Sequence, residues 1–284
     1  MNKESGIENK IPIPNTNSDE AERQGSPITG AQQSNHPGSS ETAADRLRLI
    51  LGEEALSRLQ QSRVMVIGLG GVGSSCAEAL VRGGIGSLDL VDRDVVTPSN
   101  INRQALAFHS TLGRPKTEVM RQMASDINPK CEIFTLHAFI DKDLVSEQLS
   151  VLPRPDFVVD AIDTVSQKLA IASWCQSEGI PEVSAMGGAN KLDPTRLRFA
   201  PIEETNTDPL ARIVRKEGRK RGIHDLMVLY SDELPREAEG KHSAIDEKGF
   251  VKEGASILGT MSYYPPVMGQ MLAGYVICKL AGLR

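Results

Sequence analysis

The segment from residue 63 to residue 94, RVMVIGLGGVGSSCAEALVRGGIGSLDLVDRD, constrains the fold of this chain more than any other. It opens with an unbroken apolar run over 64–67, which is typical of a β-strand buried on both faces. Four glycines follow at once and allow a tight turn with close backbone approach to a ligand: Gly68, Gly70, Gly71 and Gly73.

The residues after this glycine turn complete a recognisable unit. Residues 74–82 predict a helix whose N-terminal N–H groups point into the turn, an arrangement that binds phosphate. A second apolar strand over 88–91 ends at Asp92, about 20 residues beyond the glycines, where a carboxylate can bind ribose hydroxyls. The segment therefore predicts a nucleotide-binding β-α-β unit, although the glycine pattern alone does not identify the nucleotide.

Strand and helix patterns alternate from residue 64 to residue 185 and predict an α/β fold with a doubly wound, mostly parallel, Rossmann-like sheet. The segments 195–200 and 226–231 alternate with period two, so the C-terminal half should add antiparallel or edge strands. An apolar stripe over 45–61 that includes Ile50 predicts a helix, which Gly52 interrupts.

Composition and hydropathy indicate which part of the chain folds and whether it crosses a membrane. Residues 1–44 are polar and poor in large apolar side chains, so we expect a disordered tail before a folded domain over 45–284. The apolar segment 266–280 is too short and too polar for a confident membrane span and favours a packing helix.

The cysteines form no C-x-x-C pair, which favours neither zinc nor a disulfide framework and suits the reducing cytoplasm: Cys76, Cys131, Cys175 and Cys278. No secretory signal pattern opens the chain. Cys175 falls in a predicted helix and is interpreted as a buried structural residue rather than a nucleophile.

Polar side chains after the second strand favour ATP over a dinucleotide, because a triphosphate carries more charge and attracts an arginine, a lysine and a Mg²⁺-binding carboxylate. Each of these residues alone could be an ordinary surface or capping residue, and it is their joint spacing that indicates a site. They are Asn100, Arg103, Gln104, Lys116 and Asp163.

The spacing of these motifs resembles that of the ThiF/MoeB and ubiquitin-activating superfamily. The resemblance rests on Gly68-x-Gly-Gly-x-Gly73, Asp92-x-Asp94, Ser99-Asn-Ile-Asn-Arg-Gln104, Gly113-x-Pro-Lys116 and Asp160-Ala-Ile-Asp-Thr164. It implies that Asp92 binds the ribose and that Asp163 binds Mg²⁺. It also implies that five residues surround the triphosphate of ATP: Asp94, Asn100, Arg103, Gln104 and Lys116.

The same resemblance implies a homodimer in which Arg46 of one subunit completes the active site of the other. Arg46 would then act with Arg103, Lys116 and Asp163 as a catalytic residue. The Arg-Phe pair that members usually carry just upstream is replaced here by Ala43-Ala44.

The second half is similar to the tRNA threonylcarbamoyladenosine dehydratase branch of this superfamily. The matching pieces are Gly187-Gly188, Leu192-Asp-Pro-Thr195, Asp208-Pro-Leu-Ala211 and the basic run that ends at Gly222. The resemblance implies ATP-dependent activation of the threonyl carboxylate, by adenylation or phosphorylation, and cyclisation with loss of water. Its implied partners are tRNA carrying threonylcarbamoyladenosine and proteins of sulfur transfer, and residues 190–284 would be the tRNA-facing and C-terminal additions to a ThiF-type domain.

The basic run itself also favours RNA, because it concentrates positive charge in a chain of net charge −5. The alternative is a solvated helix face that contacts nothing. The residues concerned are Arg212, Arg215, Lys216, Arg219, Lys220 and Arg221.

Three other functions stay open at the level of sequence. One is an adenylating enzyme for a ubiquitin-like sulfur-carrier protein, which would require a small protein ending in Gly-Gly for pyrophosphate exchange. Another is an NAD-dependent oxidoreductase, which would bind NADH rather than ATP. The third is an adaptor that keeps the ATP-binding fold without catalysis.

Overall fold

The protein is described from a computed structural model that covers residues 41–237, 243–245, 251–256 and 258–283. Most of the predicted tail, residues 1–40, lies outside the described residues, as does much of the charged segment after Glu237. The chain divides into Met1–Glu41 and a second compact unit, Thr42–Arg284, which holds everything described below.

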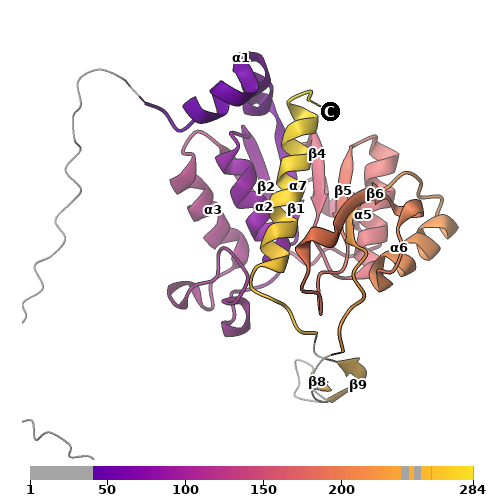
Figure 1. Cartoon of the computed structure of the whole chain (residues 1–284). Helices are drawn as coiled ribbons and strands as arrows, with labels where there is room; N and C mark the ends of the chain where they lie inside the picture. Colours follow the sequence, from indigo (N-terminus) through magenta and orange to yellow (C-terminus); the bar gives the residue numbers. More distant parts are fainter. Residues whose placement is uncertain (1–40, 238–242, 246–250, 257, 284) are drawn as a thin grey trace, which may run out of the picture. The chain divides into compact units, whose positions relative to one another are not determined.

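A seven-stranded sheet forms the centre of the second unit (Figure 1), and its strand order is β3-β2-β1-β4-β5-β7-β6. All neighbouring strands pair in parallel except β6 and β7, which are antiparallel. The strands are β1 (Arg63–Ile67), β2 (Ser87–Val91), β3 (Glu132–Leu136), β4 (Phe157–Asp160), β5 (Glu182–Ala185), β6 (Leu197–Pro201) and β7 (Met227–Ser231). The predicted doubly wound, mostly parallel sheet with an antiparallel addition is confirmed.

Helices cover both faces of the sheet, as doubly wound sheets require. They are α1 (Asp45–Gln61), α2 (Gly71–Arg82), α3 (Lys116–Ile127), α4 (Val145–Leu149), α5 (Val165–Glu178), α6 (Pro209–Lys220) and α7 (Tyr264–Leu280). Two short strands, β8 (Ser243–Ile245) and β9 (Val251–Ser256), pair separately and antiparallel. None of the helices in the described part of the chain is long and apolar enough to cross a membrane.

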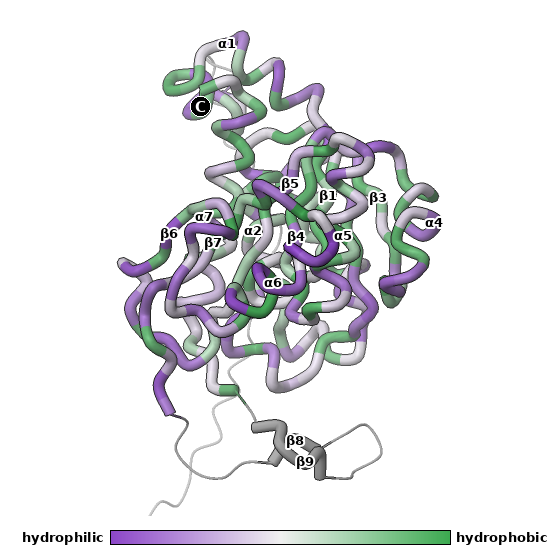
Figure 2. Tube along the Cα trace, turned by 90° about the vertical axis from the view of Figure 1, so that its right-hand side faces the viewer, coloured by the Kyte–Doolittle hydropathy of each residue, from purple (hydrophilic) through white to green (hydrophobic). Residues whose placement is uncertain are grey.

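Side chains along the central strands alternate between two hydrophobic layers. Val64 and Val66 of β1 pack with α2, α3 and α7, whereas Met65 and Ile67 pack with α4 and α5 on the opposite face. A third cluster joins α5, α6 and β7. Figure 2 shows the hydrophobic residues concentrated along these inner strands. Burial on both faces explains why the sequence of β1 is a continuous apolar run.

Helix α7 packs directly on α2 (Figure 1), with glycines at the closest contacts. A Cβ atom at Gly269 would lie 2.3 Å from the carbonyl oxygen of Val72 and 2.8 Å from the backbone nitrogen of Cys76. A Cβ atom at Gly83 would lie 2.5 Å from Ile277. The two backbones therefore approach each other more closely than helices with larger side chains at these positions could.

Three local expectations are corrected. Ile50 does not join a buried stripe but is 81% exposed, because Gly52 has φ 78° and breaks α1 between its two halves. Proline is favoured at the first position of a helix, so the sequence also predicts a helix that opens with Pro115. In the structure Pro115 is instead the N-cap, one residue before α3 begins. β7 is an internal strand that pairs in parallel with β5, so only β6 is an antiparallel edge.

Candidate active site

A cavity of about 760 Å³ lies where β1, β2, β4 and β5 reach their carboxyl ends. Ligands of open α/β sheets bind at this edge because the loops that follow parallel strands converge there. Ten residues predicted from the sequence line the cavity: Gly68, Gly70, Gly71, Asp92, Asp94, Asn100, Arg103, Gln104, Lys116 and Asp163. Of the residues predicted for the ATP site, Gly73 and Arg46 do not line it.

The glycine turn is shaped by steric contacts that no larger residue would allow. Gly68 has φ 91°, and a Cβ atom there would lie 2.9 Å from the carbonyl carbon of Ala161. A Cβ atom at Gly73 would lie only 1.7 Å from the carbonyl oxygen of Gly68. Gly73 therefore serves the folding of the turn, while Gly70 and Gly71 expose backbone to the cavity at the N-terminus of α2.

Asp92 fastens the glycine turn to the end of β2. Its carboxylate accepts hydrogen bonds from the backbone N–H of Leu69 at 2.5 Å and of Asp94 at 2.7 Å. Each carboxylate oxygen has a second lone pair, so the group can also accept from a hydroxyl in the cavity. This geometry fits the ribose-binding role predicted for Asp92.

Lys116 and Asp94 form an ion pair at the cavity wall. The Lys116 Nζ lies 2.9 Å from Asp94 Oδ2, and the Lys116 backbone N–H donates to the Asp94 carbonyl at 3.0 Å. The carboxylate is the one hydrogen-bond acceptor of this ammonium within the described residues. Two of its three N–H groups are thus available to phosphate oxygens.

The loop between β2 and α3 contributes three side chains whose bonding differs. Asn100 Oδ1 accepts from the Thr97 backbone N–H at 3.1 Å and so stabilises its own turn. Arg103 donates to the Ser99 carbonyl at 2.9 Å and is held at the cavity. Gln104 is only 7% exposed, and its Oε1 has no hydrogen-bond donor among the described residues. A buried, unpaired amide oxygen is costly, so this geometry fits the contact with the nucleotide that is predicted for Gln104.

Asp163 is exposed at the cavity, and its carboxylate accepts one bond, from the Thr164 hydroxyl at 3.3 Å. The described residues contain no cluster of three or more acidic, histidine or cysteine side chains that could hold a metal ion. Mg²⁺ is commonly bound by one or two carboxylates together with phosphates and water. Asp163 fits that pattern, which needs no all-protein cage.

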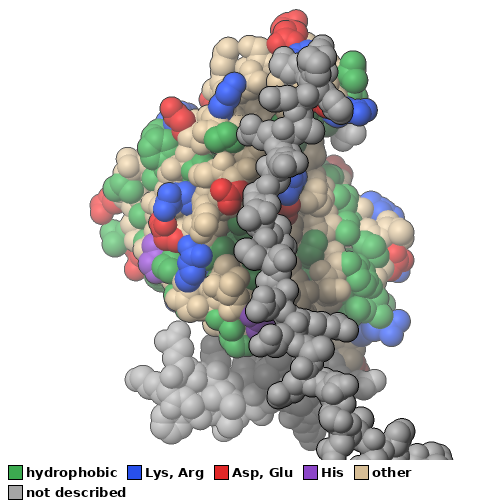
Figure 3. Space-filling model, turned by 90° about the vertical axis from the view of Figure 1, so that its left-hand side faces the viewer, with side chains coloured by type: hydrophobic (Ala, Val, Ile, Leu, Met, Phe, Trp, Pro, Cys, Tyr) green, Lys and Arg blue, Asp and Glu red, His purple; other side chains and the backbone are tan. Residues whose placement is uncertain are grey.

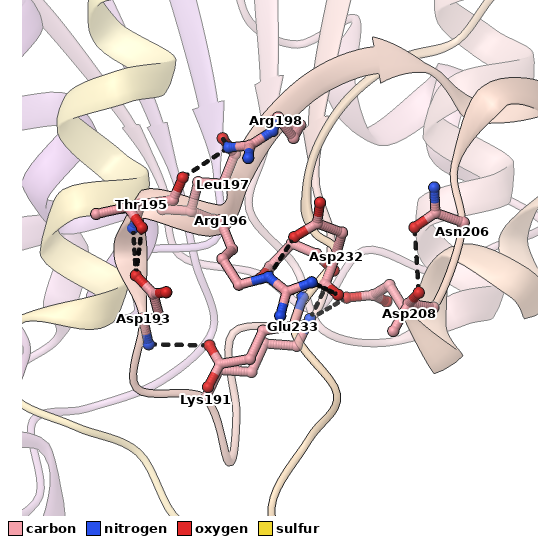
Figure 4. Close-up of polar contacts among 12 residues, drawn as sticks. Lys191, Asp193, Thr195, Arg196, Leu197, Arg198, Asn206, Asp208, Asp232 and Glu233 are labelled. Atoms are coloured by element: carbon pink, nitrogen blue, oxygen red, sulfur yellow. Dashed lines mark hydrogen bonds and ion pairs between the residues drawn. The ribbon is translucent and has the colours of Figure 1, made fainter.

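The other half of the cavity is lined by residues for which the sequence predicted no site, chiefly Lys191 and Asp208 (Figure 4). The Lys191 Nζ lies 2.6 Å from Asp208 Oδ2, and both side chains are buried. Asp208 Oδ1 caps α6 by accepting from the Ala211 backbone N–H at 2.9 Å. The cap was visible in the sequence as Asp-Pro at a helix start, but nothing in the sequence marked Lys191.

The basic run forms most of α6 and the turn after it. Arg215 is half-buried and donates to the carbonyl and hydroxyl oxygens of Thr205, at 2.7 and 2.5 Å, so it fastens the helix to the preceding loop. The other basic residues are exposed, although Lys220 pairs with Glu217: Arg212, Lys216, Arg219, Lys220 and Arg221. The spacing of Arg212, Lys216 and Arg219 places these three on one face of the helix.

Two further residues discussed from the sequence, Cys175 and Arg46, do not line the cavity. Burial raises the pKa of the Cys175 thiol and keeps it uncharged, and this confirms a structural role for the residue. Arg46 is exposed near the start of α1 and away from the residues that line the cavity of its own chain. Within one subunit, therefore, Arg46 does not contribute to the site.

Comparison with known proteins is consistent with this geometry. Residues 43–282 match the ThiF family. The chain is 40% identical over 239 residues to tRNA threonylcarbamoyladenosine dehydratase of Bacillus subtilis, covering 83% of this chain and 93% of that protein. Molybdopterin-synthase adenylyltransferase of Escherichia coli is 35% identical over 142 residues, which cover 50% of this chain and 54% of that protein.

Among solved structures, the Escherichia coli tRNA N6-threonylcarbamoyladenosine dehydratase in complex with ATP superimposes with a TM-score of 0.71. Its sequence is 29% identical, and the match covers 86% of this chain and 98% of that one. A family match over most of the chain and a relative matched over nearly its full length agree. This chain belongs to the ThiF family.

Proposed function

We propose that this protein uses ATP to cyclise threonylcarbamoyladenosine in tRNA by activating the threonyl carboxylate. The observation that supports this most is a single cavity with two differently built halves. The glycine turn, Asp92 and Lys116 suit ATP, and the half around Gly187 and Asp208 leads to the basic helix α6. The similarity to tRNA threonylcarbamoyladenosine dehydratases over the full length of the folded unit supports the same activity.

The chemistry requires two steps at one carboxylate. Its oxygen attacks the α-phosphorus of ATP and releases pyrophosphate, or attacks the γ-phosphorus and releases ADP. A nucleophile of the carbamoyl group, which gives up its proton, then attacks the activated carbonyl carbon. The bond to AMP or phosphate breaks as the ring closes, so the nucleoside loses the elements of one water. Holding both reactants in one cavity supplies the orientation that such a reaction needs.

The side chains on the glycine-turn side of the cavity, called the nucleotide half below, would have different roles in this reaction. Arg103 and Lys116 would stabilise negative charge that develops on the phosphates, which is the usual role of fixed cations in phosphoryl and adenylyl transfer. Asp163 would hold Mg²⁺, which supplies further charge neutralisation when bound. Asp92 would fix the ribose, and Asn100 and Gln104 would contact the nucleotide from the loop after β2.

We further propose that the working unit is a homodimer in which Arg46 reaches the partner's cavity. Arg46 lies on α1 near two of the most exposed large apolar residues, Leu49 at 82% and Ile50 at 81%. Exposed apolar groups on one helix are suited to burial against a second subunit. Residues 45–284 would form the ThiF-type domain, with 190–284 facing tRNA. The four unpaired cysteines suit the reducing cytoplasm.

The test is direct conversion of substrate. Purified protein, ATP and Mg²⁺ are incubated with tRNA carrying threonylcarbamoyladenosine, and the nucleosides are then analysed by mass spectrometry. A mass loss of one water that depends on ATP supports the proposal. An unchanged nucleoside with fully folded, ATP-binding protein would refute it.

The second candidate is adenylation of a ubiquitin-like sulfur-carrier protein, favoured by the partial similarity to molybdopterin-synthase adenylyltransferase. In that case pyrophosphate exchange into ATP would require a small protein ending in Gly-Gly and would ignore tRNA. The two functions are separated by which macromolecule stimulates ATP turnover.

A further inference from the structure

Two lysine–aspartate pairs are buried at the carboxyl edge of the sheet, one for each half of the cavity. Lys168 Nζ lies 2.9 Å from Asp160 Oδ2, and Lys191 Nζ lies 2.6 Å from Asp208 Oδ2. All four side chains are at most 1% exposed. Removing charges from water is costly, and such a pair persists only when its geometry and its other hydrogen bonds are good.

The first pair supports the loop that carries Asp163. Asp160 Oδ2 also accepts from the Ser184 hydroxyl at 2.7 Å, which joins β4 to β5. Asp160 Oδ1 accepts from the Ile162 backbone N–H at 3.0 Å and thereby sets the turn immediately before Asp163. This pair therefore serves the nucleotide half of the cavity.

The second pair joins three segments that are far apart in sequence. The Lys191 ammonium donates to the Gly187 carbonyl at 2.9 Å, to Asp208 Oδ2, and to the Ser231 carbonyl at 3.3 Å. Gly187 lies in the loop after β5, Asp208 at the N-terminus of α6, and Ser231 at the end of β7. All three N–H donors are used, so Lys191 has none left to act on a substrate.

Gly187, Lys191 and Asp208 line the cavity, and Asp208 is also the residue at which α6 begins. A single ammonium group thus fixes the cavity wall in relation to the helix that carries Arg212, Lys216 and Arg219. We propose that Lys191 and Asp208 are positioning residues for the macromolecular substrate. They hold the RNA-facing helix at the distance and angle that bring the modified base into the cavity, and they leave ATP binding alone. This inference rests on the proposed tRNA function.

The two pairs provide a matched experiment. The double variant Lys191→Met with Asp208→Asn removes both charges, and Asn at position 208 still offers Oδ1 to cap α6. The double variant Lys168→Met with Asp160→Asn makes the same chemical change under the other half of the cavity. Each is compared with the parent for KM of tRNA, KM of ATP, direct binding of each ligand, and melting temperature.

The expected result is a separation of effects. The Lys191/Asp208 variant should raise KM and Kd for tRNA by about tenfold or more, with those for ATP changed by less than about twofold, because only the substrate side is misplaced. The Lys168/Asp160 variant should show the reverse, with ATP constants raised more than those for tRNA. If the Lys191/Asp208 variant melts below the assay temperature, Asp208→Asn alone is measured in the same way and should show the same selectivity.

Two outcomes would overturn the inference. One is parental tRNA binding by the folded Lys191/Asp208 variant, and the other is an equal loss of tRNA and ATP binding. Failure of the parent protein to cyclise the nucleoside would instead refute the proposed function. The binding measurements separate these cases, because they do not depend on turnover.

Discussion

The Lys116 ammonium and the Asp94 carboxylate lie 2.9 Å apart, yet the lysine side chain is 5% exposed and that of the aspartate 53%. The pair thus consists of a buried cation at the cavity wall and an anion that water reaches. A triphosphate entering the cavity would meet the lysine already fixed in place, which reduces the cost of ordering it during the reaction.

Replacing this lysine should therefore affect turnover more than folding. Lys116→Met keeps the length and apolar packing of the side chain but removes the charge, and kcat should fall about 100-fold or more. Steady-state ATP turnover measures the effect. Lys130→Met, at an exposed lysine outside the cavity, is the control and should behave like the parent. A Lys116→Met enzyme with parental kcat would contradict the assignment.

Asp163 should be needed for Mg²⁺-dependent turnover but not for stability. Because the side chain is exposed and makes one weak hydrogen bond, Asp163→Asn should leave the melting temperature within about 1–2 °C of the parent. ATP turnover should fall about 100-fold or more, and the apparent affinity for Mg²⁺, measured by titration of the residual turnover, should weaken. Asp126→Asn, an exposed aspartate on α3, provides the matched control. Retained Mg²⁺ dependence in the Asp163 variant would assign the metal elsewhere.

The location of Arg46 predicts complementation between inactive subunits. Arg46→Ala and Asp163→Ala should each be inactive alone. A mixture that exchanges subunits should recover up to about a quarter of parental activity, because half of the dimers are mixed and each has one complete site. The assay is ATP-dependent cyclisation after exchange has been verified by mass. No recovery in a mixture with proven exchange would show that each chain completes its own site.

The exposed face of α6 should bind RNA phosphates. Reversing Arg212, Lys216 and Arg219 to Glu should weaken tRNA binding and lower its dependence on salt, since fewer counterions are released. ATP binding should stay unchanged. Arg215 is left intact because it fastens α6 to Thr205. Filter binding over a range of salt concentrations measures both effects.

The control for this charge reversal changes Arg114, Arg121 and Lys130 to Glu, which alters net charge equally at exposed residues on or beside α3 instead of α6. Figure 3 shows a face of the protein on which basic, acidic and hydrophobic side chains are interspersed rather than separated. Long-range charge alone would make both triple variants weaken tRNA binding to the same degree. That result would remove the case for a specific RNA surface on α6.

Asp89 predicts a pH dependence of stability. Burial raises the pKa of this carboxyl to about 6, although the Arg63 guanidinium 3.0 Å away opposes the shift. Between about pH 4 and pH 6 the Asp89 carboxyl is therefore protonated in the folded state and ionised in the unfolded state. The free energy of unfolding must fall as the pH rises through that window. The shift corresponds to about 3 kcal/mol in total.

In Asp89→Asn this contribution is absent, so the free energy of unfolding of the variant minus that of the parent should increase from pH 4 to pH 6.5. Urea denaturation at several pH values measures it. A difference that is constant across the window would show that Asp89 keeps an ordinary pKa.

The nucleotide half of the site could be predicted from the sequence because its signals are local. The glycines, Asp92 and Asp163 each sit at the end of an apolar strand, and parallel strands bring their carboxyl ends to one edge. The cavity accordingly gathers these residues together with Lys116. Hydrophobic periodicity fixed the strands closely enough for that inference.

The half of the cavity around Lys191 and Asp208 could not be predicted, since its contacts depend on the paths of loops. Lys191 meets Asp208 across 17 positions, between segments where Asn190 and Thr207 adopt positive φ of 57° and 60°. No periodic pattern encodes such turns. The exposure of Ile50 has a similar cause, because a helical stripe stays in phase only while the backbone stays helical, and Gly52 leaves that conformation.

The close packing of α7 on α2 has a consequence for the order in which the molecule matures. Helix α2, which begins in the glycine turn, is made early, and α7 follows every other described helix and strand along the chain. Leu272, Ala273 and Val276 of α7 cover the apolar side of α2. During synthesis on the ribosome, the first-made half of the nucleotide site must therefore wait with that side uncovered until α7 has emerged. A chain that stopped before Tyr264 would display this surface to chaperones and proteases instead of binding ATP.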